Sequence, residues 1–169
     1  YFYLDYYQST DIENEPFGIG GHLPIERCYS YEPYAEGMTS EQQAHVLGVQ
    51  ANLWTEYIPT YSHVEYMELP RMAALAEVQW TMPELKNYEH FLQRIPQMVK
   101  TYDMKGYNYA THVFDVTASF DPDTVKNALM ITLKTIDNAN VHYTLDGTET
   151  TSASSLFMAP IAITASCTF

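Results

Sequence analysis

The sequence predicts an α/β protein: a parallel β/α part followed by a small antiparallel β module. In the first part, short apolar runs at 1–5 and 46–53 alternate with long loops and helical patterns. This order is typical of a parallel barrel or a doubly wound sheet. From residue 112 onward, short alternating segments are separated by turn residues, which indicates antiparallel strands. We therefore divide the chain into residues 1–111 and a truncated module at 112–169.

Composition excludes several classes of partner. The 169 residues include 21 acidic and 8 basic ones, which gives a formal charge of −13. Nucleic acids and anionic membrane surfaces are bound through clusters of Lys and Arg, so we expect neither as a partner. No apolar run approaches the ~18 residues that a membrane span needs. The sequence leaves the oligomeric state unknown.

Metal and cofactor sites are not expected. The six histidines show no i, i+4 pair and no ligand spacing. The two cysteines, Cys28 and Cys167, lie far apart and form no metal-type pair. Asp11, Glu13 and Glu15 alternate in a long loop, and we interpret them as a solvated acidic face, with cation binding as the less favoured alternative.

The first half of the β/α part is expected to contain two strands. Tyr1–Asp5 is a short aromatic strand that ends in an acid, and a loop rich in Gly, Pro and Tyr follows at 6–39. Ser40 is the expected cap of a short helix. Val46–Leu53 is mostly apolar, and its composition predicts a parallel strand buried on both faces.

A helical block follows the second strand. Ser62 is the expected N-cap of the block, and Pro70 is expected to split it into two short helices. Pro83 suits the first turn of the next helix. Pro96 predicts a kink in that helix, and Gly106 is its expected end.

The pattern of residues 112–169 predicts several short strands. Alternating or β-prone residues occur at Val113–Thr117, Leu129–Leu133, Val141–Leu145 and Ile161–Thr164. The dipeptide Asp146-Gly147 is a strong hairpin signal. These segments predict a small antiparallel β domain.

A candidate sugar site lies where the two parallel strands end. In an extended segment Trp54 and Glu56 project to the same side. An indole can stack on the C–H face of a sugar ring, and a carboxylate accepts hydrogen bonds from hydroxyls. Asp5 ends the other strand, and the carboxyl ends of parallel strands meet at one edge. The alternative is that Trp54 is simply core and Glu56 a solvated loop charge.

Three blocks of the chain carry a resemblance to a known family. They are Tyr3–Asp5, Val46–Glu56 with its Trp-Thr-Glu end, and Tyr66–Trp80 with its Pro-Arg-x-x-Ala-x-x-Glu pattern. Over roughly residues 1–105 they resemble glycoside hydrolase family 20, the β-N-acetylhexosaminidases. The segments at 143–148 and 159–161 resemble the small β domain that often follows the barrel in bacterial hexosaminidases.

The resemblance implies a fold and an activity. Tyr1–Asp5 and Val46–Leu53 become the seventh and eighth strands of a (β/α)8 barrel, so the chain holds its last two β/α units. The module after it becomes an incomplete β-sandwich. The implied reaction removes terminal N-acetylglucosamine or N-acetylgalactosamine from glycans by retaining, substrate-assisted catalysis. The family also implies a secreted or periplasmic protein, because its substrates are extracellular glycans.

The resemblance also assigns roles to four residues. Tyr3 is the implied catalytic residue, whose phenol donates to the attacking acetamido oxygen of the substrate. Asp5 and Glu56 are the implied ligands of sugar hydroxyls on the far side of the ring. Trp54 is the implied apolar wall of the pocket.

One departure from the family is decisive. The general acid of the family is the Glu of an adjacent Asp-Glu pair, and this chain contains no such pair. The Arg that binds sugar hydroxyls in the family is not matched by Arg27, Arg71 or Arg94. We interpret Arg71 and Glu77 as structural, through a salt bridge or a cap. The chain is therefore expected to be a piece of a longer enzyme that carries one wall of its active site and is inactive alone.

Two other functions remain open at this stage. The first is a non-catalytic carbohydrate-binding module, in which Trp54 and the tyrosines bind sugar without chemistry. The second treats the β module as a protein-interaction or spacer domain. An Asp-Glu pair upstream in the gene distinguishes the enzyme from the binding module.

Overall fold

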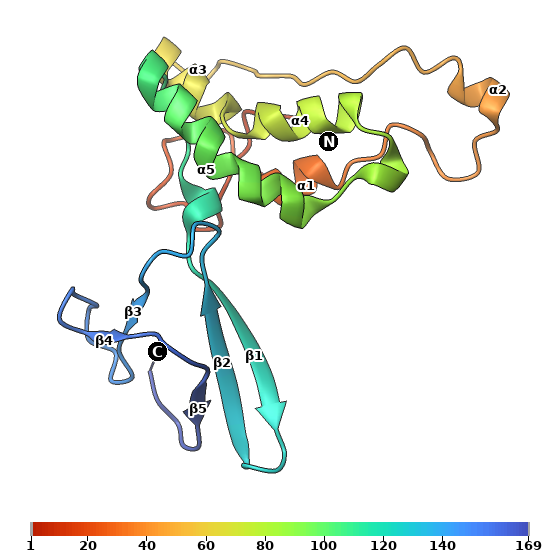
Figure 1. The fold of residues 1–169 in the computed structure, drawn as a ribbon. Coiled ribbons are helices and arrows are strands. Elements are labelled where there is room, and N and C mark those ends of the chain that lie inside the picture. The colour runs from red at the N-terminus through yellow and green to blue at the C-terminus, as the bar shows by residue number, and fades with distance from the viewer. Residues whose placement is uncertain (1, 169) are drawn as a thin grey trace. The chain divides into compact units, whose positions relative to one another are not determined.

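The computed structural model describes residues 2–168 (Figure 1). The chain divides into two compact units, Tyr1–Val113 and Phe114–Phe169, each of which is described separately here. The helices of the chain are α1 (Ile25–Tyr29), α2 (Ser40–Gln43), α3 (Tyr61–Glu68), α4 (Arg71–Trp80), α5 (Tyr88–Lys105) and the 3-10 turns η1 (Pro83–Leu85) and η2 (His112–Phe114). In the described residues, no helix is both long and apolar enough to cross a membrane.

The two expected strands of the first unit are reduced to a single parallel bridge. Tyr3 bridges Asn52 in parallel. The Leu4 amide donates to the Asn52 carbonyl at 2.7 Å, and the Asn52 amide donates to the Phe2 carbonyl at 2.7 Å. The parallel direction agrees with the β/α prediction, but neither segment forms a regular strand in the described residues.

The expected burial of Val46–Leu53 on both faces is wrong. Leu47 is 99% exposed, and most of this segment is exposed or half-buried. A parallel strand is buried on both faces only where neighbouring strands and helices cover it. Within residues 2–168 its only bridge partner is Tyr3, and a side-chain contact comes from Gln79, whose Nε2 donates to the Val49 carbonyl at 2.8 Å.

Two expected helix caps are shifted toward the N-terminus. Helix α3 is capped by Thr60, whose side chain accepts from the amide three residues on, so Ser62 lies inside the helix. Helix α2 is capped by Thr39 in a full capping box, and Ser40 is its first residue. In both cases the threonine has the extended backbone that an N-cap needs, which spacing alone did not reveal.

Proline and glycine set the remaining helix boundaries. Pro70 separates α3 from α4, as predicted. Pro83 begins the short turn η1, and the long helix α5 starts only after Asn87, whose side chain caps it. Helix α5 continues through Pro96, so the kink itself stays a prediction. Gly106 ends α5 in the left-handed conformation, with φ 69°.

The core of the first unit joins the segment at 2–5 to the helices. Fully or nearly buried apolar side chains come from that segment, α1, α3, α4 and α5: Phe2, Leu4, Cys28, Met67, Ala74, Leu75, Val78, Phe91 and Ile95. Aromatic contacts connect the elements, since the Tyr29 ring lies 4.8 Å from that of Phe91. The segment that carries Tyr3 is therefore anchored from one side by packing.

The two thiols differ sharply in environment, and this gives a first prediction. Cys28 is 0% exposed, and burial raises the pKa of its thiol to about 11, whereas Cys167 is exposed. Only the thiolate reacts with alkylating agents. In the folded full-length protein, iodoacetamide at pH 8 is expected to label Cys167 and leave Cys28 unmodified, as measured by peptide mass mapping. Labelling of both sites at equal rates before denaturation would contradict the burial of Cys28.

The second unit is a small antiparallel β structure. Strands β1 (Thr117–Asp123), β2 (Ala128–Lys134) and β5 (Ile161–Ile163) form one sheet in the order β1-β2-β5. Strands β3 (His142–Tyr143) and β4 (Ser155–Leu156) form a second, two-stranded sheet. The antiparallel pairing confirms the predicted class of this module. Its core consists of Ile131, Leu133 and Val141.

Two details of the β prediction are wrong. The expected strand at Val113–Thr117 is replaced by η2, and β1 begins only at Thr117. Asp146-Gly147 does not close a two-residue hairpin, because β3 pairs with β4 farther along the chain. Instead, the Asp146 carboxylate accepts from the amide and hydroxyl of Thr148 at 3.1 and 2.6 Å. This local turn satisfies the carboxylate without bringing two strands together.

Candidate functional site

The first segment of the chain presents Tyr3 away from the core. Phe2 and Leu4 are 4% and 2% exposed, whereas Tyr3 between them is 40% exposed. This alternation is that of an extended segment with one face on the helices. The ring of Tyr3 stacks on that of Tyr6 at 5.7 Å and an interplanar angle of 20°. The Tyr3 side chain is thus both stacked on Tyr6 and partly exposed.

Gly21 makes room for the ring that supports Tyr3. It has a φ of +74°, and a Cβ there would lie 2.5 Å from a Tyr6 ring carbon. Any side chain would therefore both strain the backbone and displace Tyr6.

Asp5 is the most unusual polar residue of this segment. It is 6% exposed, and its Oδ1 has no hydrogen-bond partner in the described residues. A buried carboxylate oxygen without a donor is costly, and such atoms commonly mark places where a ligand or water binds. The geometry suits a carboxylate that accepts a hydrogen bond from a bound hydroxyl.

Trp54 and Glu56 lie on the second segment, beyond its bridge to the first. Because Tyr3 pairs with Asn52 in parallel, Asp5 and Trp54 each lie two residues past the bridged pair. Trp54 is 57% exposed, and its indole is available for stacking. Glu56 lies in the turn where the Ile58 amide donates to the Thr55 carbonyl at 3.1 Å. A common direction for Trp54 and Glu56 therefore does not follow from strand geometry and stays a prediction.

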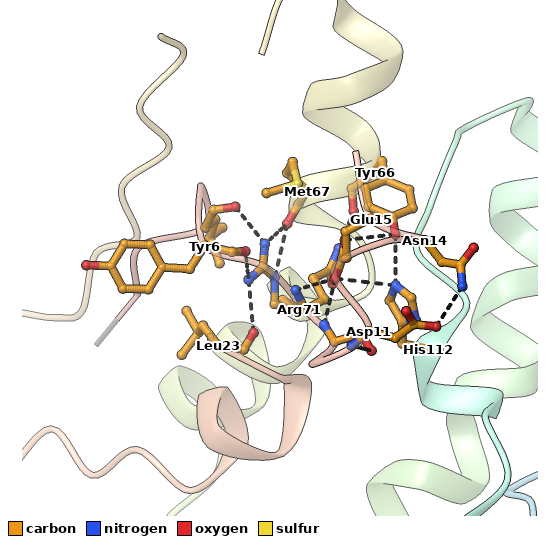
Figure 2. Close-up of polar contacts among 12 residues, drawn as sticks. Tyr6, Asp11, Asn14, Glu15, Leu23, Tyr66, Met67, Arg71 and His112 are labelled. Atoms are coloured by element: carbon orange, nitrogen blue, oxygen red, sulfur yellow. Dashed lines mark hydrogen bonds and ion pairs between the residues drawn. The ribbon is translucent and has the colours of Figure 1, made fainter. Parts of the chain in front are cut away.

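A buried arginine holds the backbone that carries Asp5 (Figure 2). Arg71, in the first turn of α4, is 0% exposed. Its Nη2 donates to the Leu4 carbonyl at 2.6 Å, and its Nη1 donates to the Tyr6 carbonyl at 3.0 Å. Further bonds run to the carbonyls of Leu23 and Met67. Burial lowers the pKa of Arg71 to about 10, so the guanidinium remains charged at neutral pH.

A buried glutamate holds the next stretch of the same loop through its amides. Glu15 Oε1 accepts from the backbone amides of Gln8 and Ser9 at 2.7 and 2.6 Å. Its Oε2 accepts from the Tyr66 hydroxyl at 3.1 Å, and His112 Nε2 lies 3.4 Å from Oε1 (Figure 2). The interpretation of Glu15 as a solvated charge is therefore wrong, because its partners come from α3 and η2.

Arg71 and Glu77 are structural, but not in the same interaction. Glu77 pairs with Arg94 of α5 at 2.6 Å, while Arg71 binds backbone carbonyls. Sequence patterns gave no signal for the second role, because carbonyl acceptors are present in every residue. The role of Glu15 was missed for a similar reason, since Tyr66 lies 51 residues away in sequence.

The larger pockets of the first unit lie elsewhere. A pocket of about 680 Å³ is lined by residues from the 46–49 segment and from the end of α4 to η1. Another, of about 510 Å³, lies between α4 and α5. Neither is lined by Tyr3, Asp5, Trp54 or Glu56, so these four residues lie outside both pockets. Among residues 2–168, no group of three or more His, Cys, Asp or Glu side chains is placed to hold a metal ion.

Comparison with known proteins gives a consistent relationship. The chain is 35% identical to a β-hexosaminidase of Porphyromonas gingivalis over 94% of its own length and 20% of the relative. It is 33% identical to a β-N-acetylhexosaminidase of Cellulomonas fimi over 63% of its length and 21% of the relative. The chain thus spans about a fifth of the length of these curated relatives.

Solved structures match about two thirds of the chain. A GH20 exo β-N-acetylglucosaminidase from Vibrio harveyi, in complex with N-acetylglucosamine, matches with a TM-score of 0.56 and 32% identity, over 65% of this chain and 17% of that one. The GH20 β-N-acetylhexosaminidase of Streptomyces coelicolor A3(2) matches with a TM-score of 0.56 and 25% identity, over 65% and 22%.

Two family models cover most of the sequence. The catalytic domain of glycosyl hydrolase family 20 matches residues 1–83. The chitobiase/β-hexosaminidase C-terminal domain matches residues 120–169. The chain therefore belongs to glycoside hydrolase family 20, with part of the catalytic domain followed by part of the C-terminal domain.

Proposed function

We propose that the full-length protein carrying this sequence is an exo-acting β-N-acetylhexosaminidase. It removes terminal N-acetylglucosamine or N-acetylgalactosamine from glycans with retention of configuration. The observation that carries the proposal is the parallel bridge between Tyr3 and Asn52, because it brings the ends of two segments together. Tyr3 and Asp5 then lie beside the segment that carries Trp54. The β-hexosaminidases of Porphyromonas gingivalis and Cellulomonas fimi support the same activity.

We further propose how these segments fit into the whole enzyme. Tyr1–Asp5 and Val46–Leu53 are the seventh and eighth strands of a (β/α)8 barrel, and the exposed side chains of the second segment are covered by other barrel strands. The second unit is part of a β-sandwich. The enzyme acts outside the cytoplasm, in the periplasm or after secretion, because extracellular glycans are its substrates.

In the proposed mechanism each residue has one task. The acetamido oxygen of the substrate attacks C1, and the Tyr3 phenol donates a hydrogen bond to that oxygen and holds it in line. Asp5 and Glu56 accept hydrogen bonds from sugar hydroxyls, and Trp54 packs against an apolar face of the ring. The proton for the leaving group comes from an acid outside this sequence, which has no adjacent Asp-Glu pair. Water then opens the cyclic intermediate.

The proposal is tested by comparing two substrates. The full-length protein is expected to hydrolyse 4-nitrophenyl β-N-acetylglucosaminide and to leave 4-nitrophenyl β-glucoside intact, because only the first has an acetamido nucleophile. Release of nitrophenol is measured by absorbance. Saturable binding of N-acetylglucosamine without release from either substrate would contradict the enzyme and favour a carbohydrate-binding module.

A further inference from the structure

We propose that Arg71 is a positioning residue of the sugar site: it fixes the backbone on both sides of Asp5 and so aims the Asp5 carboxylate at one substrate hydroxyl. This inference rests on the proposed function, in which Asp5 binds the sugar. Arg71 itself is fully buried and reaches the substrate only through Asp5.

Two of the hydrogen bonds that Arg71 donates lie on either side of Asp5 in the sequence. The two carbonyls that Arg71 binds from the first segment belong to Leu4 and Tyr6, the immediate neighbours of Asp5. The Leu4 carbonyl belongs to the peptide plane before Asp5, and the Tyr6 carbonyl to the second plane after it. The plane between Asp5 and Tyr6 is held by the Tyr6 amide, which donates to the Tyr3 carbonyl at 3.2 Å. With Arg71 fixing the outer two planes and this bond the middle one, the direction of the Asp5 Cα–Cβ bond has little freedom.

We call the hydrogen bonds from Arg71 to the Leu4 and Tyr6 carbonyls the Arg71 clamp. They hold a stretch of backbone that no regular strand supports. The segment has one bridge at Tyr3, and a turn begins immediately after it at Leu4. Backbone groups that no sheet partner binds must find other partners when they are buried. Arg71 binds the carbonyls of this turn, and Glu15 binds the amides at Gln8 and Ser9, so two buried charges replace a regular hydrogen-bond ladder.

The hydrogen bonds of Arg71 also leave one carboxylate oxygen of Asp5, Oδ1, without a hydrogen-bond donor. Asp5 is nearly buried, yet its Oδ1 has no partner in the described residues. The Arg71 N–H donors with described partners are bonded to carbonyls, so they do not occupy that oxygen. A charged acceptor held in a fixed direction discriminates strongly for a substrate hydroxyl.

Lysine cannot reproduce this arrangement. A guanidinium presents a rigid planar fork of donors, whereas an ammonium is a compact point with flexible donors. Arg71→Lys keeps the charge but cannot reach four separate carbonyls in fixed directions. We expect kcat/KM of the full-length enzyme to fall about 100-fold, the scale of a misplacement near 1 Å.

The test uses the wild type, Asp5→Asn, Arg71→Lys and the double variant. Each full-length enzyme is assayed on aryl N-acetylglucosaminide and on analogues that lack a single hydroxyl at C3, C4 or C6. The analogue on which Asp5→Asn loses least identifies the hydroxyl that Asp5 binds. Arg71→Lys is expected to lose least on the same analogue, and the double variant to be little worse than the more damaged single variant.

The control is Arg94→Lys, the same chemical change in an ion pair whose arginine side chain is 61% exposed. It is expected to leave kcat/KM unchanged on every substrate. Circular dichroism and gel filtration establish which variants fold. If Arg71→Lys does not fold, Arg71→Gln takes its place, since a neutral amide is cheaper to bury and still donates.

The results separate the possible failures. A loss from Arg71→Lys that is equal on all analogues, or that adds fully to the loss from Asp5→Asn, would show that Arg71 is only a scaffold residue. Failure of both Arg71 variants to fold would overturn the proposal in the same way. A wild-type enzyme with no turnover of the parent substrate would instead overturn the proposed function, and the positioning role with it.

Discussion

Replacing Tyr3 with Phe in the full-length protein is expected to lower kcat by about 100-fold while KM changes little. The substitution removes one hydroxyl and keeps the ring that stacks on Tyr6. Without the phenol the acetamido oxygen is no longer held in line with C1, and misalignment of reacting atoms costs on the order of 100-fold in rate. A change in kcat without a change in KM indicates an interaction made mainly in the transition state. Steady-state kinetics on an aryl N-acetylglucosaminide measure both quantities.

A matched control for this substitution is available on α3. Tyr61 is 77% exposed at the first position of that helix, and Tyr61→Phe removes the same hydroxyl from a residue outside the proposed site. It is expected to keep the wild-type kcat. If Tyr3→Phe also keeps it, the phenol has no part in the reaction. If Tyr3→Phe raises only KM, the phenol contributes to binding of the substrate and not to catalysis. That result would favour the hypothesis of a carbohydrate-binding module.

Parts of the fold that depend on local signals were predictable from the sequence. Pro70 ends one helix and Gly106 ends another because their backbone restrictions act on the residue itself. Strand β2 was predicted from the run Leu129–Leu133, whose pairing with β1 and β5 is antiparallel. These features need no knowledge of distant residues.

Features that depend on distant partners were not predictable in the same way. Apolar composition indicates that Val46–Leu53 can be buried, but burial of Leu47 requires neighbours that residues 2–168 do not supply. Glu15 looked like any acidic loop residue, because nothing local indicates that Tyr66 and His112 will meet it. Whether a side chain is apolar or acidic can be read from the sequence, but which residues surround it in the fold cannot.

The candidate site shows the same division. Asp5 and Trp54 were predicted because aromatic and acidic residues at the ends of adjacent segments suit a sugar, whereas Tyr3 was predicted only from the family resemblance. The parallel register that brings Asp5 level with Trp54 follows from the Tyr3–Asn52 bridge and needed the structure. The contribution of Arg71 needed it even more, since its acceptors are main-chain carbonyls with no signature in sequence.

The 169-residue chain assayed alone is expected to show no hydrolysis of an aryl N-acetylglucosaminide, even at high protein concentration. It has no adjacent Asp-Glu pair to protonate the leaving group, and the four proposed site residues line neither of the two larger pockets. Without a proton donor and an enclosed, water-excluding site, the acetamido attack loses most of its advantage. Nitrophenol release is compared with that of the full-length protein in the same buffer.

A complementation experiment makes this negative result informative. The remainder of the full-length protein, produced separately, is also expected to be inactive, because it lacks Tyr3 and Asp5. Co-expression of the two pieces is expected to restore turnover, since the bridge segments can then pair with the other strands of the proposed barrel, which would cover exposed apolar residues such as Leu47. Turnover by the mass-verified chain alone would show that the general acid lies within these 169 residues, and the assignment of a missing donor would be wrong.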